Sequence, residues 1–252
     1  MAVAVFPTFS PLSIYLPTLH LYQSFMFTVF PSVGGRQYEI DNLDQLEWVG
    51  RFLGRIHQVG SESLFAARPT IGLDEYLYQP REALAQCSLI PESLRAPFLS
   101  ATDKLITTTQ AFWHTDWRPL RLHGDCHPGN ILWRDGPLFV DMDDARNGPA
   151  MQDLWMLLHG DESEQRLQLD VLLEAYGEFA DLDTRELSLI EPLRAMRMVY
   201  YLAWVARRWD DPAFPKSFPW MQDEDFWRRQ IAAFTEQIKK LQAPPLQLMP
   251  MY

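Results

Sequence analysis

A polar run that leads into a predicted β-hairpin restricts the fold of this chain more than any other feature. The run reads HGDCHPGN at residues 123–130. Two short apolar runs with β-prone residues follow it, at 131–133 and 138–140. The intervening RDGP at 134–137 contains Asp-Gly, which is a strong hairpin signal. The chain must therefore fold so that a polar loop enters a two-stranded ribbon directly.

The register expected for this hairpin places two oxygen-bearing side chains opposite each other. A four-residue loop at 134–137 makes Trp133 face Leu138, so that, counting outward, Asn130 faces Asp141. Directly opposed Cβ atoms lie about 4.5–5.5 Å apart. Two oxygen ligands at that separation can share one Mg²⁺ ion. A loop one residue shorter or longer would shift the register and separate the pair.

Three polar side chains have the spacing that phosphoryl transfer uses. Asp125 precedes Asn130 by five positions, and Asp141 follows after the hairpin. This is the order of the kinase loop H-R-D-x-x-x-x-N and its later metal-binding Asp. In that reaction one carboxylate accepts the proton of the attacking hydroxyl, while an amide oxygen and a second carboxylate hold Mg²⁺. We predict Asp125 and Asp141 as catalytic residues and Asn130 and Asp141 as metal ligands.

The same run fits three other interpretations. His123, Asp125 and His127 alternate as H-x-D-x-H, which on one strand face could form the transition-metal site of a hydrolase. The run could instead be a polar turn whose Asp and Asn satisfy backbone groups. Cys126 beside His127 could be a nucleophile, although a small semi-buried residue is more typical because no third group orients the histidine.

Composition indicates a globular protein and disfavours two classes of partner. The 252 residues are 47% hydrophobic and 22% charged, enough to bury a substantial core. The net charge of −11 argues against nucleic acid and against anionic membrane surfaces as partners. Two cysteines, Cys87 and Cys126, make no disulfide framework, which predicts a cytoplasmic protein. No stretch has the length and apolarity of a transmembrane helix.

Hydrophobic periodicity predicts a mainly helical body. A strand is expected at 24–30 and helices at 43–59, 101–113, 152–158, 163–180, 191–209 and 224–241. Asp41 or Asn42 caps the first helix, and His57 on its apolar stripe is expected to be a packed structural residue. Four arginines lie along the helix expected at 191–209, and we expect them on a solvated face, with an acceptor-phosphate contact as the alternative: Arg194, Arg197, Arg207 and Arg208. The pattern predicts an α+β fold with the layout of a kinase C-terminal lobe.

Several segments resemble the aminoglycoside phosphotransferase/choline kinase-like family. They are HGDCHPGN at 123–130, VDMDD at 140–144 and GPAMQDL at 148–154. FPSVGGRQ at 30–37, RPTIGL at 68–73 and PPLQL at 244–248 narrow the resemblance to its bacterial stress-response Ser/Thr protein kinases.

This resemblance, over roughly residues 25–252, implies a protein kinase-like fold and a cytoplasmic kinase that uses ATP and Mg²⁺. The implied acceptor is a Ser/Thr hydroxyl of a protein substrate. The resemblance also implies that Asp153 is buried and braces the catalytic loop, and that residues 29–31 link two lobes.

The N-terminal part departs from the family pattern. A complete member has a phosphate-covering loop and a strand lysine, whereas the first lysine here is Lys104 and residues 1–24 contain no Asp, Glu, Lys or Arg. We expect residues 1–31 to be a remnant or non-native N-lobe segment with the hinge, in a truncated and poorly active chain. Residues 32–252 are expected to form the helical C-lobe with the catalytic loop and metal-binding hairpin. Two other functions stay open, a small-molecule kinase for an amino alcohol or antibiotic and a non-catalytic remnant that binds a partner.

Overall fold

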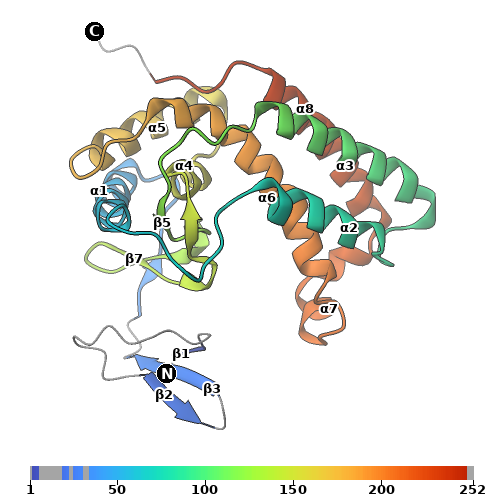
Figure 1. Cartoon of the computed structure of the whole chain (residues 1–252), viewed down its shortest axis with the longest axis horizontal. Helices are drawn as coiled ribbons and strands as arrows, with labels where there is room; N and C mark the ends of the chain where they lie inside the picture. Colours follow the sequence, from blue (N-terminus) through green and yellow to red (C-terminus); the bar gives the residue numbers. More distant parts are fainter. Residues whose placement is uncertain (1, 6–18, 23–24, 31–33, 249–252) are drawn as a thin grey trace.

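The computed structural model describes residues 2–5, 19–22, 25–30 and 34–248, and a helical body makes up most of it (Figure 1). The α-helices are α1 (Leu43–Gly60), α2 (Gln79–Ala85), α3 (Glu92–Phe112), α4 (Met151–Leu154), α5 (Glu162–Tyr176), α6 (Ile190–Ala206), α7 (Ala213–Ser217) and α8 (Glu224–Gln242). The strands are β1 (Ala2–Val5), β2 (Leu19–Tyr22), β3 (Phe25–Phe30), β4 (Arg36–Gln37), β5 (Leu120–Leu122), β6 (Ile131–Trp133), β7 (Pro137–Phe139) and β8 (Arg146–Gly148). The expected α+β fold is confirmed. Within the described part of the chain, no helix is long and apolar enough to cross a bilayer.

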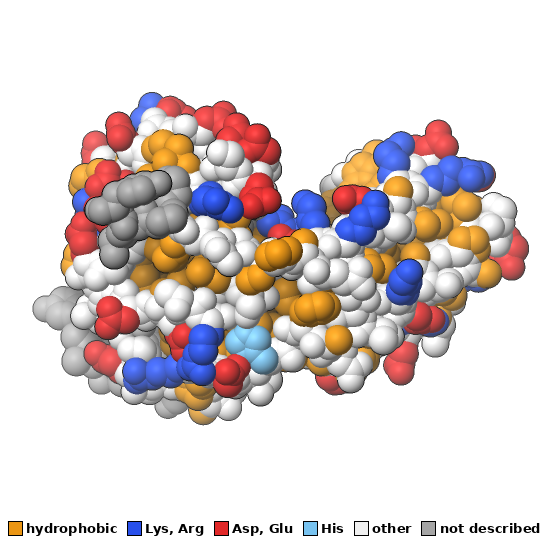
Figure 2. Space-filling model, turned by 90° about the horizontal axis from the view of Figure 1, so that it is seen from above, with side chains coloured by type: hydrophobic (Ala, Val, Ile, Leu, Met, Phe, Trp, Pro, Cys, Tyr) orange, Lys and Arg blue, Asp and Glu red, His pale blue; other side chains and the backbone are white. Residues whose placement is uncertain are grey.

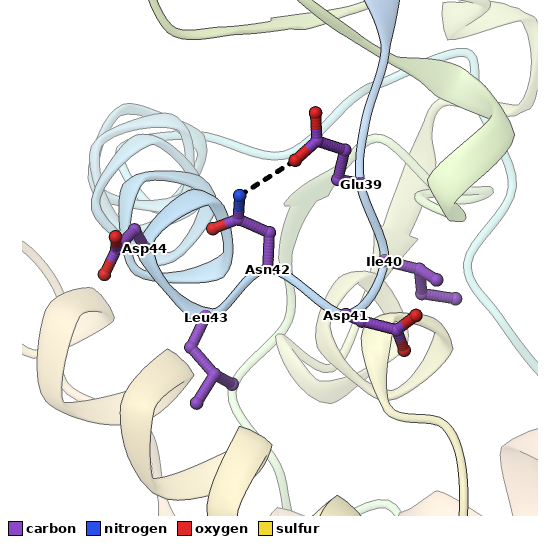
Figure 3. Close-up of a pocket in the computed structure, with 6 residues that line it drawn as sticks. All are labelled: Glu39, Ile40, Asp41, Asn42, Leu43 and Asp44. Atoms are coloured by element: carbon purple, nitrogen blue, oxygen red, sulfur yellow. Dashed lines mark hydrogen bonds between the residues drawn. The ribbon is translucent and has the colours of Figure 1, made fainter.

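Helix α1 begins where its capping residue predicts. The side chain of Asn42 accepts a hydrogen bond from the Gln45 N–H at 3.1 Å, so Asn42 and not Asp41 is the N-cap. The Asn42 amide also donates to the Glu39 carboxylate at 2.9 Å (Figure 3). The carboxylates of Asp41 and Asp44 point to opposite sides of this turn. The cap fixes the direction of α1 as it enters the core.

Helices α1 and α5 pack unusually close to each other, and this contact positions buried side chains of the core. A Cβ added at Gly50 would lie 2.6 Å from the Leu172 carbonyl oxygen, and one at Gly54 would lie 2.6 Å from that of Tyr176. Only glycine allows the two backbones to approach this closely. The contact sets the last turns of α1, including the buried His57, against Tyr176 of α5.

Two helices differ from the sequence prediction. Helix α3 begins at Glu92, nine residues earlier than expected, with Pro97 inside it. A proline early in a helix removes one backbone hydrogen bond, and the long apolar face that α3 packs against α8 offsets that loss. The helix expected at 152–158 divides into α4 and a 3₁₀ turn, Trp155–Leu157. The other long helices end within a few residues of their predicted limits.

The described strands form three small antiparallel sheets. Strand β3 confirms the strand expected at 24–30, and it pairs with β1 and β2, which no periodicity indicated. The predicted boundary between the two lobes, at residues 31–32, lies outside the described residues. After it, β4 joins the edge of the β6–β7 hairpin, and β5 pairs with β8. The polar loop therefore runs between two sheets.

The hairpin register predicted from the sequence is wrong. Trp133 pairs with Pro137, so the loop has three residues, and Asn130 lies opposite Val140, whose N–H donates to the Asn130 carbonyl at 3.0 Å. Asp135 (φ 56°) and Gly136 (φ 140°) both have positive φ, which allows the shorter loop. Asn130 and Asp141, which were predicted to face each other, are therefore not cross-strand partners.

Candidate functional site

One buried carboxylate holds the loop that contains Asp125. Asp153 of α4 is fully buried and accepts hydrogen bonds from the backbone N–H of His123 at 2.7 Å and of Gly124 at 2.8 Å. Hydrogen bonds to a charged acceptor are the stronger kind, and here they fix the backbone immediately before Asp125. The expectation that Asp153 is buried and braces this loop is confirmed.

The third bond to Asp153 comes from His57. The sequence predicted a structural role for this histidine, and its contacts confirm that role. His57 Nε2 lies 3.0 Å from the Asp153 carboxylate, and its Nδ1 lies 3.0 Å from the Tyr176 hydroxyl. A carboxylate only accepts, so Nε2 carries the hydrogen of the bond to Asp153, and Nδ1 shares the second bond with the Tyr176 hydroxyl. The ring is 1% exposed and is fully used by these two partners. His57 therefore supports the loop from behind and does not face a substrate.

A sharp turn at Gly124 decides how the following side chains are presented. Its φ is +88°, and a Cβ there would lie 2.1 Å from the carbonyl oxygen of Asp144. This turn interrupts the strand alternation that the H-x-D-x-H interpretation requires, and His123 Nε2 instead bonds to the Val140 carbonyl at 2.9 Å. Within the ranges that the structure describes, no group of three or more His, Cys, Asp or Glu side chains is arranged to hold a metal. The hydrolase metal site is therefore not formed.

Asp125 and Asn130 lie together at the open side of this loop. The Asp125 side chain is 20% exposed, so a substrate can reach its carboxylate. Asn130 ends the 3₁₀ turn Pro128–Asn130 and is buried, and its Nδ2 donates to the Asp125 carbonyl at 3.0 Å. This bond uses the nitrogen of the amide. The amide oxygen is consequently the end that could bind a cation.

Asp141 follows β7 in a left-handed conformation. Its φ of 62° and ψ of 61° end the strand and begin the 3₁₀ turn Met142–Asp144. Asn130 precedes β6 and Asp141 follows β7, so both lie at the same end of the hairpin although they are not paired. An amide oxygen and a carboxylate are hard donors of the type that suits Mg²⁺. These two residues fit the predicted ion by chemistry and by position along the hairpin.

The structure adds Arg197, which the sequence placed on a solvated face. Its Nη1 donates to Oδ1 of the Asp125 carboxylate, so that expectation is wrong for this arginine. The other carboxylate oxygen lies 3.5 Å from His127 Nε2. Burial lowers the pKa of His127, and the positive charge of Arg197 lowers it further while the Asp125 carboxylate opposes this shift. One indication of this contact was present in the sequence, where Arg197 directly follows Met196, a residue of the apolar face of its helix.

Cys126 cannot act as the nucleophile considered above. Its side chain is 0% exposed, and burial raises the pKa of its thiol well above the ordinary value. The thiolate is the reactive form of cysteine, and these surroundings suppress it. Cys126 packs as a small apolar residue, more deeply buried than the sequence suggested.

The helical fold, with its loop and hairpin, is that of a kinase-like phosphotransferase. A model of the Phosphotransferase enzyme family matches residues 3–190, and the chain belongs to that family. Because the match begins at residue 3, the expectation that residues 1–24 fall outside the resemblance is wrong.

Two bacterial relatives are similar over nearly the whole chain. Stress response kinase A of Escherichia coli K12 is 63% identical over 246 residues, which are 98% of this chain and 75% of the relative. Serine/threonine protein kinase RdoA of Salmonella typhimurium LT2 is 60% identical over 246 residues, with the same coverage. These matches confirm the narrower resemblance to stress-response kinases.

Solved structures with much lower identity share the fold. Amicoumacin kinase hAmiN has a TM-score of 0.61 at 19% identity, over 88% of this chain and 66% of that one. A microcompartment-associated aminopropanol kinase has a TM-score of 0.58 at 16% identity, over 89% of this chain and 70% of that one. The architecture is therefore kept across acceptors as different as those named.

Proposed function

We propose that this chain is a kinase that uses ATP and Mg²⁺ to phosphorylate Ser or Thr hydroxyls of a protein in a stress response. The main support is the Asp125 carboxylate, which is partly exposed while the backbone before it is tied to the buried Asp153. The names of the relatives supply the protein acceptor and the stress response. The proposed compartment is the cytoplasm, where ATP is available and where Cys87 and Cys126, both unpaired, stay reduced.

The roles proposed for the side chains follow from their chemistry. Asp125 accepts the proton of the acceptor hydroxyl. At the same time the hydroxyl oxygen bonds to the γ-phosphorus of ATP, and the bond from that phosphorus to ADP breaks. The amide oxygen of Asn130 and the carboxylate of Asp141 are the proposed Mg²⁺ ligands. When bound, the ion supplies positive charge against the phosphates. Asp153 and His57 keep the loop in place without touching the substrate.

The rate of this polypeptide is expected to be low. Residues 1–103 contain no lysine, so they cannot supply the lysine that holds the α- and β-phosphates in kinases. Loss of one positioned donor at a developing charge lowers kcat about 10²–10³-fold. We therefore propose slow turnover compared with the Escherichia coli relative assayed alongside.

The test uses γ-labelled ATP, Mg²⁺ and casein as a generic acceptor protein. We expect weak labelling of casein or of the chain itself, abolished by Asp125→Asn and unchanged by the matched exposed variant Asp210→Asn. Labelling that survives Asp125→Asn would contradict the proposed role of Asp125. Absence of both labelling and thermal stabilisation by Mg·ATP would favour the non-catalytic binding function instead. The same assay with amino alcohols and antibiotics as acceptors tests small-molecule phosphorylation, which the names of the structural neighbours suggest.

A further inference from the structure

Arg197 is used differently from the other arginines in α6 and directly after it. Arg194 pairs with Glu191 at 3.2 Å, and its guanidinium lies 4.9 Å from the ring centre of Trp155. Arg208 lies 4.6 Å from the ring centre of Trp204. The contact of Arg194 with Trp155 holds α6 to a neighbouring turn, and the contacts with Glu191 and Trp204 lie within the helix and its end. All of them are structural in kind.

Within the described ranges, the side chain of Arg197 hydrogen-bonds to Asp125 and to no other residue. It is also 32% exposed. More generally, on the face of the molecule that Figure 2 shows, several Lys and Arg side chains are exposed beside a hollow between two rounded parts.

The guanidinium has more donors than this bond uses. Arginine carries five N–H donors in a rigid planar fork, and the contact with Asp125 Oδ1 engages Nη1 only. Its other nitrogens are held beside the carboxylate without a partner among the described residues. They remain available for an anion.

The position of Asp125 limits where the reacting phosphorus lies. A hydroxyl that gives its proton to Asp125 sits at hydrogen-bond distance from the carboxylate, about 2.6–3.2 Å. The phosphorus that it attacks lies about 3–3.5 Å further on. Together these two steps span about 6–7 Å. A path from the carboxylate across the guanidinium to an oxygen hydrogen-bonded on its other side has a comparable length. The remaining N–H groups of Arg197 can therefore contact the phosphoryl oxygens.

In the part of the chain that the structure describes, no Lys or Arg other than Arg197 forms an ion pair with Asp125. The loop at 123–130 contains no Lys or Arg, and no lysine precedes Lys104. His127 is the other basic side chain at the Asp125 carboxylate, with its Nε2 3.5 Å from Oδ2, but unlike a guanidinium an imidazole is not permanently charged. Among the described residues, Arg197 is the permanently charged partner of Asp125.

We propose that Arg197 is a catalytic residue that neutralises the charge of the transferring phosphoryl group. Nη1 stays on the Asp125 carboxylate while the remaining N–H groups donate to the phosphoryl oxygens. The bond from phosphorus to ADP breaks as the bond to the acceptor oxygen forms, and the acceptor proton passes to Asp125. This inference rests on the proposed function and adds to it a cation from a helix 72 residues further along the chain.

Binding of a transition-state mimic tests this role without knowledge of the acceptor. Mg·ADP with aluminium fluoride mimics a phosphoryl group in transfer, and binding is measured as thermal stabilisation of the full chain. For the unmodified chain we expect aluminium fluoride to tighten Mg·ADP binding about 10²-fold. Arg197→Ala should bind Mg·ADP normally and lose most of this gain. Arg197→Lys should keep part of it, and Arg207→Ala, an exposed arginine at the end of the same helix, should keep all of it.

The turnover data should agree with the binding data. Arg197→Ala should lower kcat about 10²-fold or more while the KM for ATP stays nearly constant, which a purely structural loss would not produce. Melting without ligand identifies a variant that fails to fold, and Arg197→Lys then carries the test.

The inference is overturned if aluminium fluoride tightens Mg·ADP binding as much in Arg197→Ala as in the unmodified chain. It is also overturned if aluminium fluoride does not tighten binding to the unmodified chain. If the unmodified chain does not bind Mg·ADP at all, the proposed function fails as well.

Discussion

Asp153→Asn is expected to destabilise the protein strongly, because it replaces one oxygen of a buried carboxylate that accepts three hydrogen bonds. Oδ1 accepts from the Gly124 N–H, and Oδ2 accepts from the His123 N–H and from His57 Nε2. The asparagine NH₂ must face one of these donors. The better orientation places the asparagine NH₂ group toward Gly124. The bond from the Gly124 N–H is then lost, and this N–H faces the N–H groups of the asparagine.

The magnitude follows from these bonds. A hydrogen bond to a charged group contributes about 1.5–3 kcal/mol, and a neutral one about 0.5–1.5 kcal/mol. One charged bond is lost, and the other two become neutral, each weakening by about 1 kcal/mol. The expected loss is therefore about 3–5 kcal/mol, which is a large share of the 5–15 kcal/mol typical of a domain.

Urea unfolding followed by circular dichroism measures this loss as a difference in free energy of unfolding. Asp210→Asn, which makes the same chemical change at an exposed position, should stay within about 0.5 kcal/mol of the unmodified chain. A loss below about 1 kcal/mol for Asp153→Asn would refute the reasoning. It would mean that the loop is held by contacts other than this carboxylate.

Three further outcomes can be checked. Burial raises the pKa of Glu186 from 4.5 to about 7, so its contribution to stability is complete below pH 4.5 and is lost as the pH rises through 7. The loss is about 3 kcal/mol, and Glu186→Gln should remove it from the pH dependence of the free energy of unfolding. Gly124→Ala should destabilise by more than about 2 kcal/mol in urea unfolding, because its Cβ meets the Asp144 carbonyl, whereas Gly72→Ala should change little. Cys126 should resist iodoacetamide at pH 8 in the native protein and react after unfolding in urea, as mass spectrometry would show.

Local patterns in the chain predicted much of the fold. Helix α1 follows from the cap at Asn42 and from the apolar repeat of Leu46, Val49 and Leu53, all of which are buried. The hairpin follows from Asp-Gly between two β-prone runs. Capping, amphipathic spacing and turn chemistry act over a few residues, so the sequence expresses them directly.

Other features depend on conformations that composition does not reveal. The hairpin closes with three residues because Asp135 and Gly136 take positive φ, and Asp141 leaves its strand through a third such conformation. Asparagine, aspartate and glycine permit positive φ without requiring it. The register could therefore not be fixed from the turn residues alone.

The sequence by itself determined which residues form the loop and the hairpin, and hence where Asp125 and Asn130 lie along the chain. Only the tertiary structure showed that Arg197 meets the Asp125 carboxylate and that Asp153 holds the backbone just before it. Spacing within one loop is a local property, whereas these contacts join helices 28 and 72 residues away. Packing of the whole helical body decides such contacts, because it sets which face of each helix turns toward the loop.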